Sequence, residues 1–219
     1  MLSLYCVKYA ESVLDESLIF IDGTPNKALP ISFAVYLIQT EGRNILVDAG
    51  CDTMPGFVMK DFRSPADVLR DLEIDADTVT DVIITHAHHD HIEAVTHFKN
   101  AVLYITEEEY ADGKKYIPDQ MEVCVVPDVY EILPRIKIVK IGGHAAGSAV
   151  VEIDEGEIIH VLAGDECYVN DCLVYKRPTG TFCNPEKSRA FVEKYSDAKY
   201  RVYTCHDISL KTAKILLEE

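Results

Sequence analysis

The sequence lacks any apolar run that approaches the roughly 20 residues needed to span a lipid bilayer. Its first segment, residues 1–8, also lacks the basic start and the apolar stretch of a secretory signal peptide. We therefore expect a cytoplasmic protein without a membrane partner.

Positive charge is scarce as well. The chain has 21 Lys and Arg residues against 37 Asp and Glu residues, which gives a formal net charge of −16 at pH 7. An extended nucleic-acid surface needs clustered Lys and Arg side chains to neutralise phosphates, and the sequence has no such cluster. The composition thus argues against nucleic acid as a partner but still admits a small, neutral or mildly anionic substrate.

The sequence also has no CxxC spacing, and its seven cysteines form an odd set. This pattern disfavours a disulfide framework and a zinc site built from cysteines, so we expect reduced thiols. The cysteines are Cys6, Cys51, Cys124, Cys167, Cys172, Cys183 and Cys205.

Low-complexity tracts and charge blocks that would mark a linker are absent too. The 219 residues, 48% of them hydrophobic and 26% charged, are enough to bury a full core. No domain boundary is visible, and we predict a single domain over residues 1–219, with two fused halves as the alternative.

What the sequence does contain is a series of short, β-branched apolar runs, which predict β-strands. They cover residues 33–38, 44–48, 81–85, 102–105, 136–141, 149–153, 157–163 and 200–204. Hairpin-like turns at Glu41-Gly42 and at 154–156 predict antiparallel neighbours, so we expect sheets with helices outside rather than a plain alternation of strands and crossover helices.

Helix signals stand between some of these strands. Ser64 before Pro65 predicts an N-cap, Thr106 with Glu109 predicts a capping box, and Asn184 opens a third helix. A fourth helix is predicted over 208–217. The stretches 51–63 and 112–134 have weak periodicity, and we expect irregular structure there.

The strongest chemical signal directly follows the apolar run 81–85, where four histidines and an aspartate stand in six residues, 86–91. If the chain stays extended, His86 and His88 point the same way and converge on one metal ion. Asp90 and His91 follow where the chain should turn into a helix, so they can hold a second ion. Paired ions in such sites lie about 3.5–4 Å apart, a spacing that one short loop can serve.

This HxHxDH motif after an apolar strand resembles the signature of the metallo-β-lactamase superfamily, and further motifs follow in that family's order. The run Val47-Asp48-Ala49-Gly50 resembles its early aspartate turn, and the loop 143–148 resembles its GHTxGS loop. The run 163–165 is similar to its bridging-carboxylate strand end, and 205–207 supplies its last histidine.

The resemblance implies a fold and a set of ligands. The fold is α+β, an αββα sandwich of two mixed β-sheets with helices on the outer faces. Carried over residue by residue, the ligands of one metal ion are His86, His88 and His144, those of the other are Asp90, His91 and His206, and Asp165 bridges the two. Asp48 supports the ligands from nearby. Imidazole and carboxylate donors without thiolate suit two zinc ions best, although manganese, iron and cobalt also accept them.

Within the superfamily the chain is especially similar to the N-acyl-homoserine lactonases. Tyr168 stands three residues after Asp165, as in those enzymes, and 205–208 resembles their Gly-His-Asp terminal motif. This likeness implies a quorum-quenching hydrolase that opens a lactone with hydroxide bridged between two ions. Tyr168 would donate a hydrogen bond to the substrate carbonyl or oxyanion, and Asp90 would pass a proton to the departing alkoxide.

Two departures leave the substrate open. Ile92-Glu93-Ala94 stands in place of a small Gly-rich step, and Ala145-Ala146 in place of Thr-Pro. They spare every ligand but change the pocket wall, so another activated ester, a thioester or a β-lactam is an alternative substrate. A metal-binding module without turnover is the alternative from a different class. Glyoxalase-type and nuclease relatives carry an additional domain, and flavodiiron relatives carry a flavin domain and a glutamate where His88 stands here, so we do not expect those activities.

The remaining histidines and one loop receive plainer interpretations. His97 and His160 fall outside the motifs, and His160 is expected as a hydrogen-bonded core residue. His89 occupies the variable motif position, and the Cys205 side chain is expected to point away from His206. The apolar loop 51–63 is expected to line the pocket or to form a homodimer contact.

Overall fold

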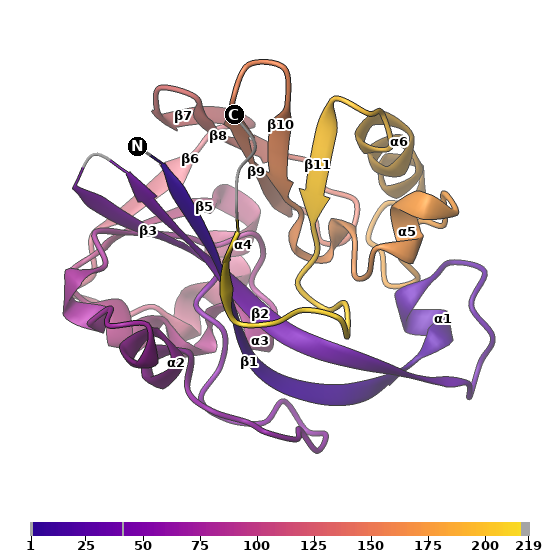
Figure 1. The fold of residues 1–219 in the computed structure, drawn as a ribbon, viewed down its shortest axis with the longest axis horizontal. Helices are drawn as coiled ribbons and strands as arrows, with labels where there is room; N and C mark the ends of the chain where they lie inside the picture. Colours follow the sequence, from indigo (N-terminus) through magenta and orange to yellow (C-terminus); the bar gives the residue numbers. More distant parts are fainter. Residues whose placement is uncertain (1, 41, 216–219) are drawn as a thin grey trace.

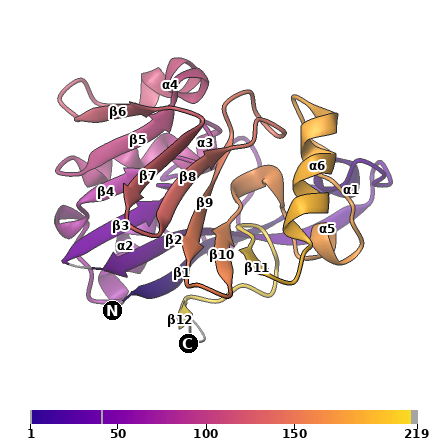
Figure 2. The same cartoon turned by 90° about the horizontal axis from the view of Figure 1, so that it is seen from above.

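The structure is a computed structural model that describes residues 2–40 and 42–215. Two mixed β-sheets pack face to face, and helices cover their outer faces (Figure 1, Figure 2). This arrangement confirms the predicted α+β sandwich. No helix in the described part of the chain is long and apolar enough to cross a membrane.

The first sheet has seven strands in the order β12-β1-β2-β3-β4-β5-β6. The pairs from β12 to β3 are antiparallel, and those from β3 to β6 are parallel. The strands are β1 (Ser3–Asp15), β2 (Ala28–Thr40), β3 (Arg43–Val47), β4 (Asp81–Ile83), β5 (Val102–Thr106), β6 (Val123–Val126) and β12 (Ala213–Ile215).

The second sheet has five strands in the order β11-β10-β9-β8-β7. Only the β10–β11 pair is parallel. The strands are β7 (Val129–Leu133), β8 (Ile136–Lys140), β9 (Ala149–Asp154), β10 (Ile159–Leu162) and β11 (Tyr200–Tyr203). Because β8, β10 and β11 run in one direction, their carboxyl ends lie at the same edge of the sandwich.

Alternate residues of the strands fill the space between the sheets. Ile38, Ile45 and Ile83 of the first sheet share a cluster with Ile138 and Val151 of the second, and all five are buried. Burial of each such side chain stabilises the fold by about 1.5–3 kcal/mol. The opposite faces of both sheets pack against helices.

The first sheet is covered by α2, whose Leu69 is fully buried, and the second by α6, which packs beside β11. The α-helices are α1 (Glu16–Ile19), α2 (Pro65–Asp71), α3 (His89–Ile92), α4 (Glu107–Gly113), α5 (Asp171–Val174) and α6 (Pro185–Tyr195). The 3₁₀ helices are η1 (Ala76–Thr78), η2 (Glu93–Phe98), η3 (Lys114–Tyr116) and η4 (Gly164–Glu166).

Each predicted strand range contains a strand, but four strands were not predicted. The longest is β1, in which a register shift between Lys8 and Ala10 breaks the alternation of buried and exposed residues. Strands β6 and β7 lie within the stretch 112–134, so the expected irregular structure is wrong there. Both are short, and β7 has no fully buried residue.

The predicted helix over 208–217 is also wrong. Residues 208–212 are irregular, and β12 (Ala213–Ile215) instead pairs with the otherwise open edge of β1. Hydrogen bonds offered by that edge outweigh a weak helical preference. Residues 216 and 217 lie outside the described part of the chain.

Antiparallel strands flank both predicted turns, although one turn includes a residue that the structure does not describe. Asp154 pairs with Ile159 across a β9–β10 hairpin, as predicted. Thr40 and Arg43 likewise pair across the β2–β3 connection, although Glu41 itself is outside the described residues. All seven cysteines are free thiols, also as predicted.

All three predicted helix starts are confirmed, because helices begin at Pro65, Glu107 and Pro185, but only one of the three predicted side-chain caps forms. The Asn184 side chain accepts hydrogen bonds from the backbone N–H groups of Glu186 and Lys187, as an N-cap should. Ser64 precedes α2 without a side-chain cap. Thr106 and Glu109 do not form a capping box, because both side chains bind the loops that carry the predicted metal ligands.

Candidate metal centre

The seven side chains predicted as ligands gather at one edge of the sandwich. They come from loops that follow the carboxyl ends of β4, β8, β10 and β11. The members are His86, His88, Asp90 and His91 after β4, His144 after β8, Asp165 in η4 after β10, and His206 after β11.

The loop after β4 changes direction as predicted. His88 has an extended backbone at the N-cap position of α3, and the helix begins at His89. His86 and His88 therefore project before the helix starts, whereas Asp90 and His91 belong to its first turn. One short segment thus serves two neighbouring groups of donor atoms.

The first group contains three imidazoles. His88 Nδ1 lies 3.1 Å from His86 Nε2 and 2.9 Å from His144 Nε2. Asp165 Oδ2 completes the group, 3.6 Å from His86 Nε2 and 3.5 Å from His144 Nε2. His86 and His144 are buried, so only His88 is open to solvent.

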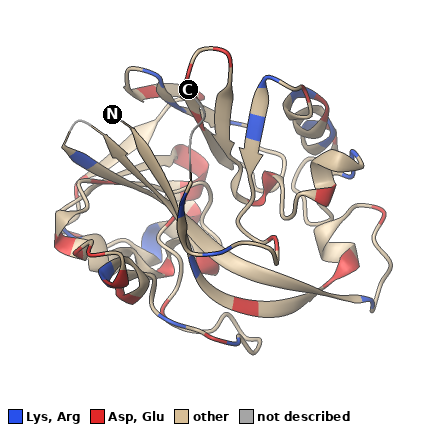
Figure 3. Ribbon diagram, viewed as in Figure 1, with Lys and Arg blue, Asp and Glu red and all other residues tan. Residues whose placement is uncertain are grey.

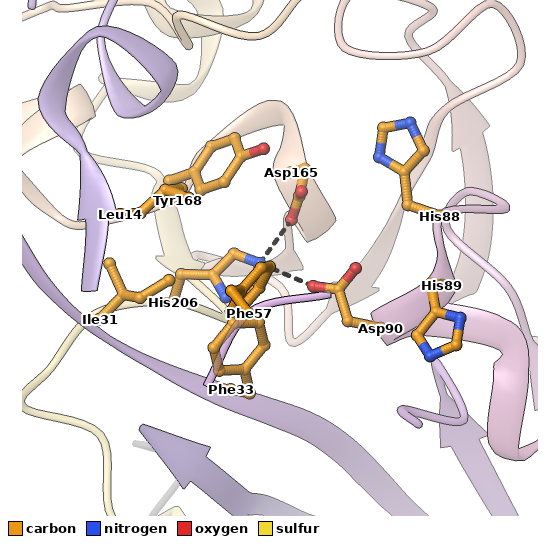
Figure 4. A pocket seen from close by; sticks show the side chains of 10 residues that line it. All are labelled: Leu14, Ile31, Phe33, Phe57, His88, His89, Asp90, Asp165, Tyr168 and His206. Carbon is orange, nitrogen blue, oxygen red and sulfur yellow. Dashed lines mark ion pairs between the residues drawn. The ribbon is translucent and has the colours of Figure 1, made fainter. Parts of the chain in front are cut away.

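The second group forms around the other oxygen of Asp165. Oδ1 lies 3.2 Å from His91 Nε2 and 3.0 Å from His206 Nε2. Asp90 stands further out, its Oδ2 being 3.6 Å from His91 Nε2 and 3.7 Å from His206 Nε2. Figure 4 shows the carboxylates of Asp90 and Asp165 both directed at His206.

Cys205 also belongs to the second group, which sequence reasoning did not foresee. Its Sγ lies 3.2 Å from Asp165 Oδ1. The expectation that Cys205 points away from His206 is wrong, because β11 ends at Tyr203 and the chain bends at Cys205 and His206, which brings both side chains into one donor group. The alternation of a strand therefore no longer applies.

Hydrogen bonds on the outer ring nitrogens hold the imidazoles in place. His206 Nδ1 donates to Ser32 O at 2.9 Å, and His144 Nδ1 donates to Thr181 O at 2.9 Å. Because a carbonyl oxygen only accepts, Nε2 of both rings is left for the centre.

Asp48 has the supporting place that the resemblance implied. Its Oδ2 lies 2.8 Å from His91 Nδ1, and the carboxylate also accepts hydrogen bonds from the Thr85 backbone N–H and hydroxyl. The Thr85 hydroxyl, which donates to Asp48, is in turn 3.2 Å from His86 Nδ1. Asp48 therefore fixes the orientation of one histidine from each group.

Burial and neighbouring charges shift the pKa values of the buried histidines in opposite directions. Burial, reinforced by His91, holds the pKa of His86 well below its usual range, and burial lowers the pKa of His144 to about 4. Burial also opposes charge on His91, but attraction to Asp165 and Asp48 outweighs it and raises the pKa of His91 well above its usual range. Although burial alone would raise the pKa of Asp165, the neighbouring histidines, His91 first among them, hold it well below its usual range.

The donor atoms fit divalent metal ions. His91 Nε2 is buried and has no hydrogen-bond partner, although a buried polar atom ordinarily has one. Two sets of four donor atoms, sharing Asp165, each lie within 4.8 Å of one another. Imidazoles and carboxylates converging in this way are the ligands that divalent ions such as zinc prefer.

Two buried glutamates, not identified from the sequence, fasten the loops of this centre. Glu109 accepts the Ala87 backbone N–H at 2.8 Å with one oxygen and the Gly147 N–H at 2.8 Å with the other. Glu166 Oε1 accepts the backbone N–H of His144 at 3.1 Å. In the sequence, Glu109 stands at a capping-box position, and that local pattern did not indicate the backbone groups of Ala87 and Gly147 that it binds.

A pocket of about 270 Å³ opens onto the centre (Figure 4). One wall is apolar and the other carries the polar groups of the centre. The lining residues are Leu14, Ile31, Phe33, Phe57, His88, His89, Asp90, Asp165, Tyr168 and His206. Phe57 belongs to the loop 51–63, so that loop contributes to the pocket. Of the two expectations for this loop, pocket lining is therefore confirmed.

Tyr168 stands at the polar side of this pocket. Its ring stacks on that of His206 with centroids 5.1 Å apart. Burial, with the charges of Asp165 and Asp90, raises the pKa of Tyr168 well above its usual range. The hydroxyl therefore remains protonated and able to donate at neutral pH.

The other histidines lie outside the two groups. His160 is buried, and its Nδ1 is 2.9 Å from the Tyr203 hydroxyl, in keeping with a hydrogen-bonded core residue. His89 Nε2 contacts Thr53 O at 2.8 Å, and His97 Nε2 pairs with Asp52 at 2.5 Å.

Lys and Arg residues are dispersed over several elements of the ribbon (Figure 3).

Comparison with known proteins adds a family and several relatives. Residues 34–203 match the family model described as the metallo-beta-lactamase superfamily. The N-acyl homoserine lactonase AiiA of Bacillus thuringiensis subsp. kurstaki is 22% identical over 94% of this chain and 93% of its own.

Solved structures agree in fold. An N-acyl homoserine lactone hydrolase with the product N-hexanoyl-L-homoserine at its catalytic metal centre is similar, with a TM-score of 0.83 and 21% identity over 97% of this chain and 98% of that one. The dizinc quorum-quenching lactonase AidC is similar over 95% of this chain and 88% of its own, with a TM-score of 0.74 and 16% identity.

Proposed function

Because this chain belongs to the metallo-beta-lactamase superfamily, we propose that it is a metal-dependent hydrolase that opens a lactone, with an N-acyl-homoserine lactone or a similar small lactone as substrate. The observation that carries the proposal is that Tyr168, Asp90 and Asp165 face one pocket, opposite an apolar wall. The relative that bears the name N-acyl homoserine lactonase AiiA supports it over nearly the full chain.

The proposed ligands are those that the sequence predicts. His86, His88 and His144 would hold one divalent ion. Asp90, His91 and His206 would hold the other, with Asp165 between the two. Zinc suits this donor set best. When bound, a pair of such ions lowers the pKa of water and polarises the carbonyl that is attacked.

Tyr168 is proposed to bind the substrate carbonyl. Its protonated hydroxyl donates a hydrogen bond, which strengthens as negative charge develops on the carbonyl oxygen during ring opening. Stacking against His206 restricts the ring, so the hydroxyl is held in place before substrate arrives. The residue thus orients the ester and stabilises the oxyanion.

Asp90 is proposed to move a proton as well as to bind metal. Its side chain is 18% exposed, whereas that of Asp165, which lines the same pocket, is 4% exposed. A carboxylate in that place can accept a proton from water and deliver it to the departing alkoxide. The ring-opened product would then leave as a hydroxy acid.

The apolar wall supports a substrate with an acyl chain. Leu14, Ile31, Phe33 and Phe57 face the same pocket as the polar groups, so an ester can lie at the centre while its hydrocarbon part covers these side chains. Removal of apolar area from water supplies about 25 cal/mol per Å². Such a wall favours acylated lactones over small polar esters.

Metal analysis combined with a substrate panel tests the proposal. The purified protein is loaded with zinc and assayed with acyl-homoserine lactones, linear esters, thioesters and a β-lactam. Two zinc ions per chain and preferential lactone hydrolysis are expected. Two ions without hydrolysis of any substrate would favour a non-catalytic metal-binding module, and preference for a thioester or β-lactam would contradict the lactone assignment.

The cytoplasmic location, a homodimer contact and the lack of nucleic-acid or membrane partners stay predictions from the sequence, as does a single domain over 1–219.

A further inference from the structure

Cys205 occupies a fixed position beneath the proposed second ion. Its backbone carbonyl accepts the Ala34 N–H at 3.0 Å, and the next backbone N–H, that of His206, donates to Tyr168 O at 3.1 Å. These bonds tie the segment to β2 on one side and to the η4 loop on the other. Cys205 and His206 are therefore both held against Asp165, although they are adjacent in sequence.

The second group of donor atoms has the dimensions of a metal site that includes sulfur. Sγ of Cys205, Oδ1 of Asp165 and Nε2 of His206 belong to a set in which all donor atoms lie within 4.8 Å of one another. The S–O distance is 3.2 Å and the N–O distance is 3.0 Å. Two donor atoms that share a zinc ion, with bonds of about 2.3 Å to sulfur and about 2.0–2.1 Å to nitrogen or oxygen and bond angles of about 90–110°, lie about 2.9–3.6 Å apart.

A second observation points to an ion at this place. His91 Nε2 is buried, belongs to the same set and has no hydrogen-bond partner. Its Nδ1 lies 2.8 Å from Asp48 Oδ2, so the ring is oriented with Nε2 toward the thiol and the carboxylate. This nitrogen, which lies near Asp165 Oδ1 without a hydrogen bond, therefore faces the position that an ion would take.

We propose that Cys205 is a further ligand of the second ion and binds it as a thiolate. This inference rests on the proposed function, which places an ion there, and it adds a donor that no superfamily motif in this sequence assigns. Cys205 is 3% exposed and does not line the pocket, whereas Asp90 does. The thiolate approaches the ion from the core and Asp90 approaches it from the pocket.

Ligation by the thiol is balanced by loss of a proton. In the present arrangement the S–H donates to Asp165 Oδ1. When the ion takes the place of that hydrogen, the proton leaves to solvent and the sulfur–metal bond forms. The second site then has a soft ligand, which favours zinc or cobalt over manganese, while the first site has only nitrogen and oxygen donors.

The chain offers a matched control. Cys6 is also 3% exposed and buried in the sandwich, but it is not part of either donor group. A change at Cys6 therefore perturbs a thiol of equal burial without altering the proposed ligands. Cys205→Ser keeps the shape of the side chain and removes the sulfur.

X-ray absorption of the zinc-loaded protein tests the inference directly. We expect a sulfur neighbour at about 2.3 Å from zinc in the wild type and in Cys6→Ser, and its loss in Cys205→Ser. Cobalt substitution gives a second readout, a near-ultraviolet sulfur-to-cobalt charge-transfer band with the same dependence on Cys205. If Cys205→Ser fails to fold, the wild-type spectra still test the inference, because the absence of a sulfur neighbour there would overturn it.

The outcomes separate this inference from the proposed function. Two zinc ions per chain and lactone hydrolysis without any sulfur neighbour would overturn ligation by Cys205 and leave the proposed function standing. A sulfur signal that persists in Cys205→Ser would overturn it too. Failure to bind a second ion would remove both.

Discussion

Asp165 meets His206 with only one of its carboxylate oxygens. Oδ1 is 3.0 Å from His206 Nε2, while Oδ2 is directed toward the other donor group. A single buried side chain therefore connects the two sets of imidazoles, one with His86, His88 and His144 and the other with His91 and His206.

Asp165→Asn is expected to reduce both metal content and hydrolysis. The amide offers one oxygen instead of two and carries no charge to balance two cations, so at least one ion should be lost. We expect less than two zinc ions per chain by elemental analysis and a fall in kcat/KM of at least roughly 10²-fold. Full lactonase activity in this variant would show that the carboxylate does not bridge the ions.

Tyr168→Phe is expected to slow ring opening while leaving the metal content unchanged. The substitution removes one hydrogen-bond donor to the developing oxyanion, a loss that costs about 10²-fold in kcat in comparable sites. Steady-state kinetics with a short acyl lactone measure the effect. The control is Tyr175→Phe, because Tyr175 is exposed and does not line the pocket.

Glu109→Gln is expected to weaken the first ion selectively. Both carboxylate oxygens accept backbone N–H groups, from Ala87 and Gly147, and an amide would turn its own NH₂ toward one of them. The loops that carry His88 and His144 should then separate, with a loss of about 10–100-fold in metal affinity. Competition with a chelator measures that affinity.

Glu108→Gln is the control for this variant, since the Glu108 side chain is 41% exposed and pairs with Lys140 instead of with the loops of the centre. Equal losses of metal affinity in the two variants would mean that the overall negative charge of α4, and not the clamp on the two loops, is responsible.

The ligand-type residues of the site could be predicted from the sequence, whereas the contacts that hold its loops together could not. Ligand-type residues at fixed spacing sufficed for the members of the run 86–91, because local geometry decides where they point, whereas His144, Asp165 and His206 followed from the resemblance to a family. Cys205 and Glu109 were placed wrongly, since their partners are remote in sequence and a local pattern suggested something else. A strand was expected to continue at Cys205, and a capping box was expected at Glu109.

Strands that depend on local sequence could likewise be predicted, whereas strands that depend on remote pairing or on a bulge could not. Strands with buried, β-branched runs, such as β4, could be identified from the sequence, whereas β1 could not, because a bulge shifts its alternation at Lys8. Strand β12 depends on pairing with that same β1. Its formation is decided by a partner about 200 residues away in the chain, which no local pattern contains.

Glu16, which directly follows β1, should make the free energy of unfolding depend on pH. Glu16 accepts hydrogen bonds from the Thr24 backbone N–H and from Lys27, and these interactions lower its pKa to about 2 from an ordinary value of 4.5. Since the folded-state pKa is depressed, its contribution is complete above pH 4.5 and is lost as the pH falls toward 2.

The measurement is denaturant unfolding of metal-free wild type and Glu16→Gln between neutral pH and acid. We expect the difference in free energy of unfolding to be constant at neutral pH and to shrink below pH 4.5. A difference that stays constant down to the acid limit would contradict a depressed pKa at Glu16.

The apolar wall should set the preference for acyl chain length, and Phe57 offers the most direct test. Its ring lies 6.0 Å from that of Phe33 and lines the pocket from the loop 51–63. Phe57→Ala removes apolar area that a long acyl chain would cover and a short one would not reach. A loss of about 1–3 kcal/mol, or roughly 10–200-fold, is the range for apolar contacts of this size.

We therefore expect kcat/KM for a long-chain lactone to fall about tenfold or more relative to that for a short-chain lactone. The neighbouring residue supplies the control: Val58 is 76% exposed and does not line the pocket, so Val58→Ala should leave the ratio of the two substrates unchanged. An equal fall for both lactones in Phe57→Ala would indicate that the loop supports the site as a whole and does not read the acyl chain.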